Sequence, residues 1–299
     1  MLTILGPTAT GKTALAARVA YELNGEVISA DSRQVYRRMD IGTGKDFADY
    51  IIEGAPVPYH LIDIAEPGTE YNIFRYQQDF LRVYGDIKDR GKLPVLCGGS
   101  GMYLESVLKG YHLPEVQRDP IYTESLLNKT EEGLTDILRS LKTLHNKTDL
   151  EDRDRLIRAI EIEMKARGNN SGPAFPKISS TVFGIWFPRG LLKKRITDRL
   201  QGRLENGMIA EIEQLLKSGI TPERLMRYGL EYKSGTRFVT GEISFDELFN
   251  SLNTAIHQFS KRQMTWFRRM ERQGLKIHWI DGRWALREKM AFIIDHLPD

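Results

Sequence analysis

An octapeptide with the pattern of a phosphate-binding loop begins at Gly6. Its sequence is GPTATGKT, ending at Thr13, which matches G-x-x-x-x-G-K-[ST]. The apolar segment Leu2–Leu5 precedes it and an Ala-rich helical pattern over Ala14–Leu23 follows, so the loop has the strand–turn–helix context it needs. Its glycines let backbone N–H groups face an anion beside a helix N-terminus, Lys12 adds positive charge, and Thr13 offers a hydroxyl to Mg²⁺. The loop predicts a bound diphosphate or triphosphate, without indicating which molecule carries it.

Length and composition limit the class of protein. The chain has 299 residues, enough for one large core and a smaller lobe, and its net charge of +3 is mild. The only cysteine, Cys97, ends an apolar stretch, which predicts a buried thiol and a reducing compartment. No apolar run reaches membrane-spanning length, and no signal-peptide pattern precedes the first strand. We expect a cytoplasmic monomer with no membrane partner.

The spacing of apolar segments predicts the fold class. Helical patterns over Thr13–Leu23 and Ile73–Asp89 alternate with apolar runs typical of buried strands. This alternation predicts an α/β fold: a P-loop NTPase-like parallel sheet core with helices on both faces. The expected strands are Leu2–Leu5, Glu26–Ser29, His60–Ile64, Pro94–Cys97, Thr181–Trp186 and Lys276–Ile280.

Changes in patterning predict three parts of the chain. Residues 1–110 form the first part of the core, and 111–150 are polar, helical and poorly patterned, as expected for a small helical insertion domain. Residues 151–299 contain the rest of the core and long amphipathic helices over Arg189–Ser218 and Phe245–Met270.

The segment Ser29–Tyr36 (SADSRQVY) follows the second expected strand. Ligands of open α/β sheets bind at the carboxyl ends of the strands, so this segment is expected beside the phosphate loop. Asp31 is suited to bind Mg²⁺, to act as a general base or to contact a base edge. A cap of a following helix by Asp31 or Ser32 explains the pattern equally well.

Two glycine-containing turns are weaker signals. Gly98–Tyr103 (GGSGMY) follows the strand Pro94–Cys97, where glycines allow close approach of a ligand or of a packed helix. Asp40–Lys45 (DIGTGK) is expected as a second polar turn on the same face.

Basic residues cluster in three helical segments. Arg155 and Arg158 share one helix face, as do Arg195 and Arg199. Each pair suits a solvated face, or stabilisation of charge on a leaving oxyanion beside a phosphate loop. His257–Arg269 interleaves cations with aromatics, which suits nucleic-acid contact or a half-buried helix with snorkelling cations.

The order of the motifs resembles the tRNA dimethylallyltransferase family. That order is GPTATGKT, SADSRQVY, MDIGTGK, GGSGMY, RLIRAIEI, RITDRL, YGLEY and KRQMTWFR, which together cover most of the chain. The resemblance implies a P-loop core with a helical insertion, which holds the two substrates at opposite mouths of a channel. It also implies transfer of the dimethylallyl group of dimethylallyl diphosphate to N6 of adenine 37 in the tRNA anticodon stem-loop.

The resemblance assigns roles residue by residue. Asp31 is implied to accept the N6 proton, with Arg199 neutralising the bridging oxygen and Thr8 as a third catalytic residue. Thr13 is implied to hold the Mg²⁺ cofactor. The implied diphosphate ligands are Gly6, Thr8, Ala9, Thr10, Gly11, Lys12 and Thr13. The implied tRNA contacts are Asp31, Ser32, Arg33, Gln34, Ser100, Arg155 and Arg158.

The chain departs from the usual family pattern in four places. Ser100 replaces the usual Thr, Asp154 replaces a Gln, and MDIGTGKD replaces the commoner DIGTAKP around Gly44. The segment Asp119–Thr123 lacks the basic residue that relatives often carry. These departures concern the choice of tRNA more than the core chemistry.

Three other functions compete with this one. A small-molecule P-loop kinase would need an arginine-rich lid, which the insertion does not offer. An adenylate isopentenyltransferase shares the chemistry but alkylates a free nucleotide, and the long basic helices favour tRNA over it. A non-enzymatic RNA-binding protein is disfavoured because Lys12, Thr13 and Asp31 are all intact.

Overall fold

The computed structural model describes residues 1–113, 120–141, 153–168 and 175–297. They form two compact units, one made of Met1–Lys109 with Lys177–Asp299 and one of Gly110–Pro176. No helix in these ranges is both long and apolar enough to span a bilayer.

A six-stranded sheet forms the centre of the larger unit. Its order is β5-β2-β6-β1-β7-β8, and all pairs are parallel. The predicted parallel α/β sheet is therefore confirmed. Because the strands are parallel, the loops that follow them meet at one edge, where ligands of such sheets bind. The strands are β1 (Leu2–Leu5), β2 (Gly25–Ala30), β5 (Tyr59–His60), β6 (Leu93–Gly98), β7 (Thr181–Trp186) and β8 (Ile277–Asp281).

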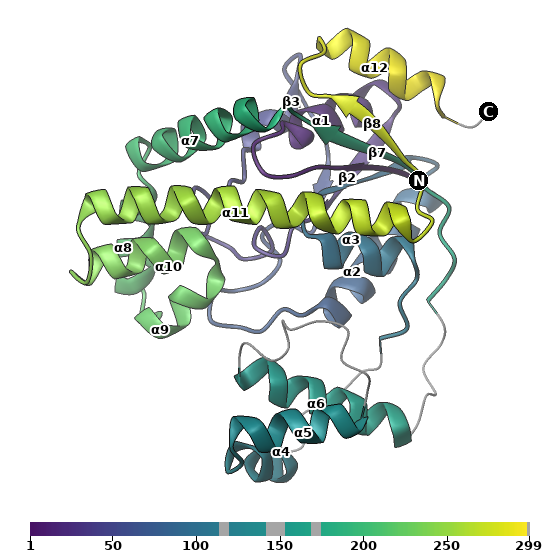
Figure 1. The fold of residues 1–299 in the computed structure, drawn as a ribbon. Coiled ribbons are helices and arrows are strands. Elements are labelled where there is room, and N and C mark those ends of the chain that lie inside the picture. The colour runs from purple at the N-terminus through teal and green to yellow at the C-terminus, as the bar shows by residue number, and fades with distance from the viewer. Residues whose placement is uncertain (114–119, 142–152, 169–174, 298–299) are drawn as a thin grey trace. The chain divides into compact units, whose positions relative to one another are not determined.

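Helices cover both faces of this sheet (Figure 1). Helix α1 (Lys12–Glu22) and helix α12 (Leu286–Asp295) share an apolar core with the strands. Helices α2 (Ile73–Asp89) and α3 (Gly101–Leu108) lie on the opposite side. Cys97 is buried in the core that α1 and α12 share with the strands, as predicted.

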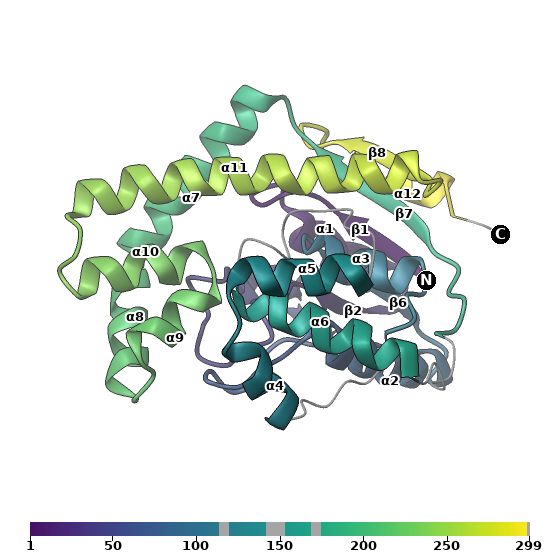
Figure 2. The ribbon, with the colours of Figure 1, turned by 60° about the horizontal axis from the view of Figure 1, so that its bottom comes forward.

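A second apolar core in the same unit is built mainly by helices, together with Val35, Tyr36 and Met39 from the segment after β2. Helix α11 is the longest of these helices and runs from α10 past α7 to α3 (Figure 2). The prediction of one helix over Arg189–Ser218 was wrong, because the chain turns at Gly207, where φ is 99°. The helices are α7 (Arg189–Glu205), α8 (Met208–Lys217), α9 (Pro222–Leu225), α10 (Leu230–Val239) and α11 (Phe245–Arg272).

The strand expected over His60–Ile64 is the other correction in this unit. The edge strand β5 ends at His60, because Leu61 and Asp63 have φ of 62° and 56°, which breaks an extended chain. Before it lie a 3₁₀ turn, η1 (Phe47–Tyr50), and a small hairpin of β3 (Ile51–Ile52) and β4 (Ala55–Pro56). None of these was predicted.

The smaller unit is a helical cluster with its own core. It comprises α4 (Pro120–Leu127), α5 (Glu131–Leu141) and α6 (Arg153–Gly168). We expected the insertion over 111–150, whereas the compact unit extends over Gly110–Pro176 and includes α6. The reason is that α6 buries Leu156 and Ile160 against leucines of α4 and α5.

Candidate active site

The phosphate loop is shaped by two residues with positive φ. Ala9 has φ of 63° and Gly11, which precedes α1, has φ of 77°. The buried hydroxyl of Thr10 donates to the carbonyl of Pro7 at 2.8 Å, so this side chain holds the loop together and does not face a ligand. A Cβ on Gly6 would lie 2.9 Å from that same hydroxyl, so glycine is required there.

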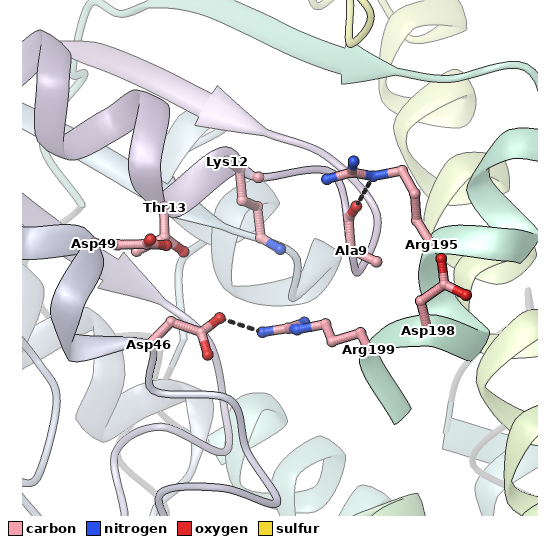
Figure 3. Close-up of a pocket in the computed structure, with 9 residues that line it drawn as sticks. Ala9, Lys12, Thr13, Asp46, Asp49, Arg195, Asp198 and Arg199 are labelled. Carbon is pink, nitrogen blue, oxygen red and sulfur yellow. Dashed lines mark hydrogen bonds and ion pairs between the residues drawn. The ribbon is translucent and has the colours of Figure 1, made fainter. Parts of the chain in front are cut away.

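A cavity of about 320 Å³ opens beside the loop. In Figure 3, Lys12 and Arg199 point into the same space from opposite sides. The neighbouring Arg195 donates from Nε to the carbonyl of Ala9 at 2.9 Å, tying α7 to the loop. The lining residues are Ala9, Gly11, Lys12, Thr13, Asp46, Asp49, Arg195, Asp198 and Arg199.

Arg199 is held at both ends of its guanidinium group. Nη1 donates to Oγ1 of Thr8 at 3.3 Å, and Nη2 binds Oδ2 of Asp46 at 2.6 Å. The side chain is 30% exposed, so a ligand in the cavity can reach it. The structure thus brings together Thr8, Lys12 and Arg199, three residues that the sequence analysis placed at one site.

Lys12 is a partly buried cation with a second cation, Arg199, nearby. Burial lowers the pKa of Lys12, and the nearby Arg199 lowers it further, whereas the carboxylates of Asp31 and Asp46 oppose this shift. An anion placed between Lys12 and Arg199 would oppose this shift, because it favours the charged form of the lysine.

Three carboxylates, those of Asp46, Asp49 and Asp198, line the cavity with Thr13, and the first two are close enough to interact. Burial raises the pKa of Asp49, and the neighbouring Asp46 raises it further. Such a carboxylate pair is stabilised by a cation. In the described ranges, no group of three or more His, Cys, Asp or Glu side chains could hold a metal on its own. A metal here would therefore need oxygens from the ligand as well.

The turn after β2 carries Asp31, the candidate base. No helix follows it, so the helix-cap explanation is wrong, and Oδ1 of Asp31 instead accepts the N–H of Arg33 at 2.9 Å. The N–H of Ser32 donates to Oγ of Ser100 at 3.0 Å. The Gln34 side chain is engaged within the protein, accepting from the hydroxyl of Ser29 and donating to the carbonyl of Gly44.

The turn Asp40–Asp46 is held by the buried Lys45 and by Glu211 of α8. Nζ of Lys45, a residue 6% exposed, binds Asp40, Asp63 and the carbonyl of Tyr36. Glu211 on α8 accepts the backbone N–H groups of residues 40–42. Lys45 is thus part of the scaffold, and the turn presents Asp46 to Arg199.

Arg203 lies one helical turn beyond Arg199 on α7 and packs over Gly44. A Cβ on Gly44 would overlap the Arg203 guanidinium, and φ there is +68°. Arg203 is 12% exposed and binds Glu231 at 3.3 Å. Burial lowers the pKa of Arg203, and Arg199 lowers it further. Sequence reasoning singled out neither Arg203 nor the cavity residues Asp46 and Asp49, because their contacts are made only in the folded chain.

The glycines at the end of β6 and just after it allow close packing. A Cβ on Gly98 would overlap the carbonyl of Ala30, and one on Gly101 would lie 2.5 Å from the ring of Trp266. Of the two explanations for GGSGMY, packing therefore accounts for both positions.

The cation–aromatic segment of α11 lies largely against the protein. Phe267 is fully buried, and Trp266 packs on Gly101 with the Arg269 guanidinium stacked 4.1 Å from its ring. Arg269 also binds the buried Glu105. The cations Lys261, Arg262 and Arg268 are exposed, and so is the ring of Phe259, which is 38% exposed. Trp266 and Phe267 therefore pack inward, as in the half-buried alternative, whereas Phe259 stays at the surface.

The arginine pair of α6 belongs to the smaller unit. Arg158 is 27% exposed and forms an ion pair with Glu161 at 3.0 Å. The side chains of Arg155 and Asp154 lie outside the described part of the chain. Thr123, at the end of the segment that lacks the basic residue common in relatives, donates to Glu161.

Sheet, loop and cavity together define a P-loop α/β protein with a cation-lined cavity beside the loop and a carboxylate, Asp31, after β2 at the same edge of the sheet. The family model described as IPP transferase matches residues 34–270, and one described as isopentenyl transferase matches residues 1–54. The chain belongs to the IPP transferase family.

Individual relatives agree with this. The chain is 56% identical over 293 residues to tRNA dimethylallyltransferase 1 of Parabacteroides distasonis, covering 97% of this chain and 95% of the relative. The full-length tRNA isopentenylpyrophosphate transferase of Bacillus halodurans superposes with a TM-score of 0.70 at 31% identity, covering 98% of this chain and 94% of that one. A eukaryotic dimethylallyltransferase acting on tRNA shares the fold, with a TM-score of 0.78 at 22% identity and coverage of 100% and 80%.

Proposed function

We propose that this chain transfers the dimethylallyl group of dimethylallyl diphosphate to N6 of the adenine at position 37 of tRNAs, releasing diphosphate. One arrangement supports the proposal: Lys12 and Arg199 line one cavity, while Asp31 follows β2 at the same edge of the sheet, near enough for its charge to oppose the lowering of the Lys12 pKa. The bacterial relatives named tRNA dimethylallyltransferase support it over nearly the whole chain length.

The diphosphate binds the loop backbone and the cations of the cavity. The allylic C–O bond breaks and its electron pair moves to the bridging oxygen, where Arg199 offsets the charge. The adenine N6 lone pair forms the new C–N bond, and Asp31 accepts the N6 proton. An allylic centre ionises readily once its leaving group is neutralised, so this phosphate loop receives a leaving group and donates no phosphoryl.

The acceptor base must leave its stack to react. N6 of a stacked adenine cannot be attacked in line with the leaving group, so we infer an extruded base. We propose that the residues around Asp31 contact this adenosine and its neighbours. They are Ser32, Arg33 and Gln34, which follow Asp31 in the chain, and Ser100, which accepts the N–H of Ser32. Arg155 and Arg158 are proposed to contact the tRNA backbone.

The donor atoms of the cavity fit Mg²⁺. The hydroxyl of Thr13 and the carboxylates of Asp46 and Asp49 are the hard oxygen ligands that Mg²⁺ prefers, completed by substrate phosphates. The hydroxyl of Thr13 would hold the ion, and the carboxylate of Asp49 would be a second protein ligand. When bound, Mg²⁺ would neutralise part of the diphosphate charge. The expected cytoplasmic location and monomeric state remain predictions.

The test offers two donors and two acceptors to the purified protein with Mg²⁺. Dimethylallyl diphosphate with unmodified tRNA transcript should give a mass gain at adenine 37, and AMP should not be alkylated. Alkylation of AMP would favour the adenylate isopentenyltransferase, and transfer of phosphate from ATP to a small acceptor would favour the kinase. Tight tRNA binding with no transfer would indicate the non-enzymatic protein.

A further inference from the structure

Gln263 on α11 is a buried polar residue within the segment whose sequence suggested RNA contact. It is 7% exposed, so it cannot contact RNA from the surface. A buried amide needs hydrogen-bond partners, because an unpaired one costs stability. Its partners therefore indicate what the residue does.

Both ends of the Gln263 amide bind backbone of the candidate active site. Oε1 accepts the N–H of Thr8 in the phosphate loop at 2.9 Å, and Nε2 donates to the carbonyl of Gly99 at 2.9 Å. A Cβ on Gly99 would lie 2.5 Å from Nε2, so the glycine makes room for the amide. One side chain thus joins the loop after β1 to the turn after β6.

The second turn continues to the candidate base. Ser100 follows Gly99, and its Oγ accepts the N–H of Ser32, the neighbour of Asp31. The N–H of Ser100 also donates to the carbonyl of Ala30 at 3.2 Å, on the other side of Asp31. The resulting path of hydrogen bonds runs from Thr8 through Gln263 and Ser100 to the turn that carries Asp31.

The same contact defines what Thr8 offers to the diphosphate. Because its backbone N–H is taken by Gln263, that group is not part of the anion cradle. The hydroxyl of Thr8 is held by Arg199 instead. Gln263 therefore fixes the backbone of Thr8. The position of the Thr8 hydroxyl, and with it the contact to Arg199, depends on that backbone.

We propose that Gln263 is a positioning residue that fixes the distance between the electrophile on the phosphate loop and the nucleophile beside Asp31. The inference rests on the proposed function, because it assigns the two substrates to these two turns. Each turn can bind its own substrate without the other. The rate of transfer, however, depends on the reacting atoms being held near attack distance, and a shift of about 1 Å can cost about 100-fold.

The test compares three variants in single turnover with both substrates saturating. Gln263→Met keeps the volume and removes both bonds, and Gln263→Glu keeps the acceptor for Thr8 but loses the donor to Gly99. Gln77→Met is the matched control, since Gln77 is 2% exposed and its Nε2 donates to the carbonyl of Ser106 at 2.9 Å, on the far part of α3. Thermal unfolding of each variant gives the loss of stability.

We expect Gln263→Met to slow transfer about 10- to 100-fold, with KM for tRNA and for dimethylallyl diphosphate changed by less than about threefold. Gln263→Glu should be intermediate, and Gln77→Met should stay within about twofold even if it unfolds at a lower temperature. Equal slowing in the Gln263 and Gln77 variants would overturn the inference, as would a change confined to the KM of the diphosphate. If Gln263→Met does not fold, Gln263→Glu decides by the same criteria. A wild-type protein that transfers nothing would overturn the proposed function, and this inference with it.

Discussion

Nη2 of Arg199 lies 2.6 Å from Oδ2 of Asp46, although 153 residues separate them in the chain. The ion pair holds the guanidinium at the cavity, where Nη1 also contacts the hydroxyl of Thr8. An arginine fixed in this way is oriented before a ligand arrives, which is the condition for stabilising charge that develops during a reaction.

Arg199→Ala should therefore slow transfer by about 100-fold or more, the usual loss for one charge-stabilising donor. Arg199→Lys should recover part of the rate, because it restores the charge but not the two-ended geometry. The rate is measured in single turnover, alongside tRNA affinity. A change in tRNA affinity alone would move Arg199 to the RNA-binding surface.

The effects of substitutions at Gly44 and at Arg203 on the rate of transfer should be coupled. Gly44→Ala places a methyl group where the Arg203 guanidinium lies, and should slow transfer about 10- to 100-fold by displacing the arginines. Adding Arg203→Met should restore part of that rate. Gly241→Ala is the control, since its φ of +77° is as strained but nothing lies within 4 Å. Independent, additive losses in the double variant would show that the two residues do not interact.

Replacing Arg155 and Arg158 by Ala should raise the KM for tRNA and leave the rate at saturation unchanged. Removing two phosphate contacts should make the plot of log affinity against log salt shallower by about 1 to 2. Arg139→Ala on α5, an arginine 62% exposed, serves as the control in the same unit. An unchanged salt slope would leave the pair as surface charge.

Glu26 on β2 should make stability depend on pH. Hydrogen bonds from Arg90, then from Lys92 and His60, hold the pKa of this buried carboxyl well below its ordinary value of 4.5. Since the folded-state pKa is the lower one, the stabilisation is present above about pH 4.5 and is lost as the pH falls below it.

Glu26→Gln should therefore lower the free energy of unfolding at pH 7 by about 1–2 kcal/mol, a modest value because Arg90 is 39% exposed and partly screened. Urea denaturation at pH 7 and pH 4 checks this. The difference between variant and wild type should shrink at pH 4, and a constant difference would contradict the assignment.

The sequence was most informative where a local pattern determines structure. The apolar run Leu2–Leu5 followed by GPTATGKT specified a strand, a turn and a helix, because each depends on neighbouring residues alone. Contacts between residues far apart in the chain could not be predicted from the sequence. Asp46 meets Arg199 and Gln263 meets Thr8 only after helices from the second half of the chain pack on the sheet. Neither pairing leaves a periodic or spaced signal.

Local patterns also misled in instructive places. His60–Ile64 is apolar enough for a strand, but positive φ at Leu61 and Asp63 ends β5 early. The rings of KRQMTWFR suited stacked bases and a half-buried helix equally, and in the structure Trp266 fills the space left by Gly101. In each case a tertiary contact or a backbone turn decided between two structures that the composition allowed equally.

The most direct test of the account is the single-turnover rate of Asp31→Asn and Asp31→Ala with saturating tRNA and dimethylallyl diphosphate. Both variants remove the proposed proton acceptor, and Asp31→Asn does so with almost no change in shape. We predict a fall of about 100- to 10,000-fold in the rate of N6 alkylation, with tRNA affinity within a few-fold of wild type. A rate within about tenfold of wild type would contradict the assignment of Asp31 as the base.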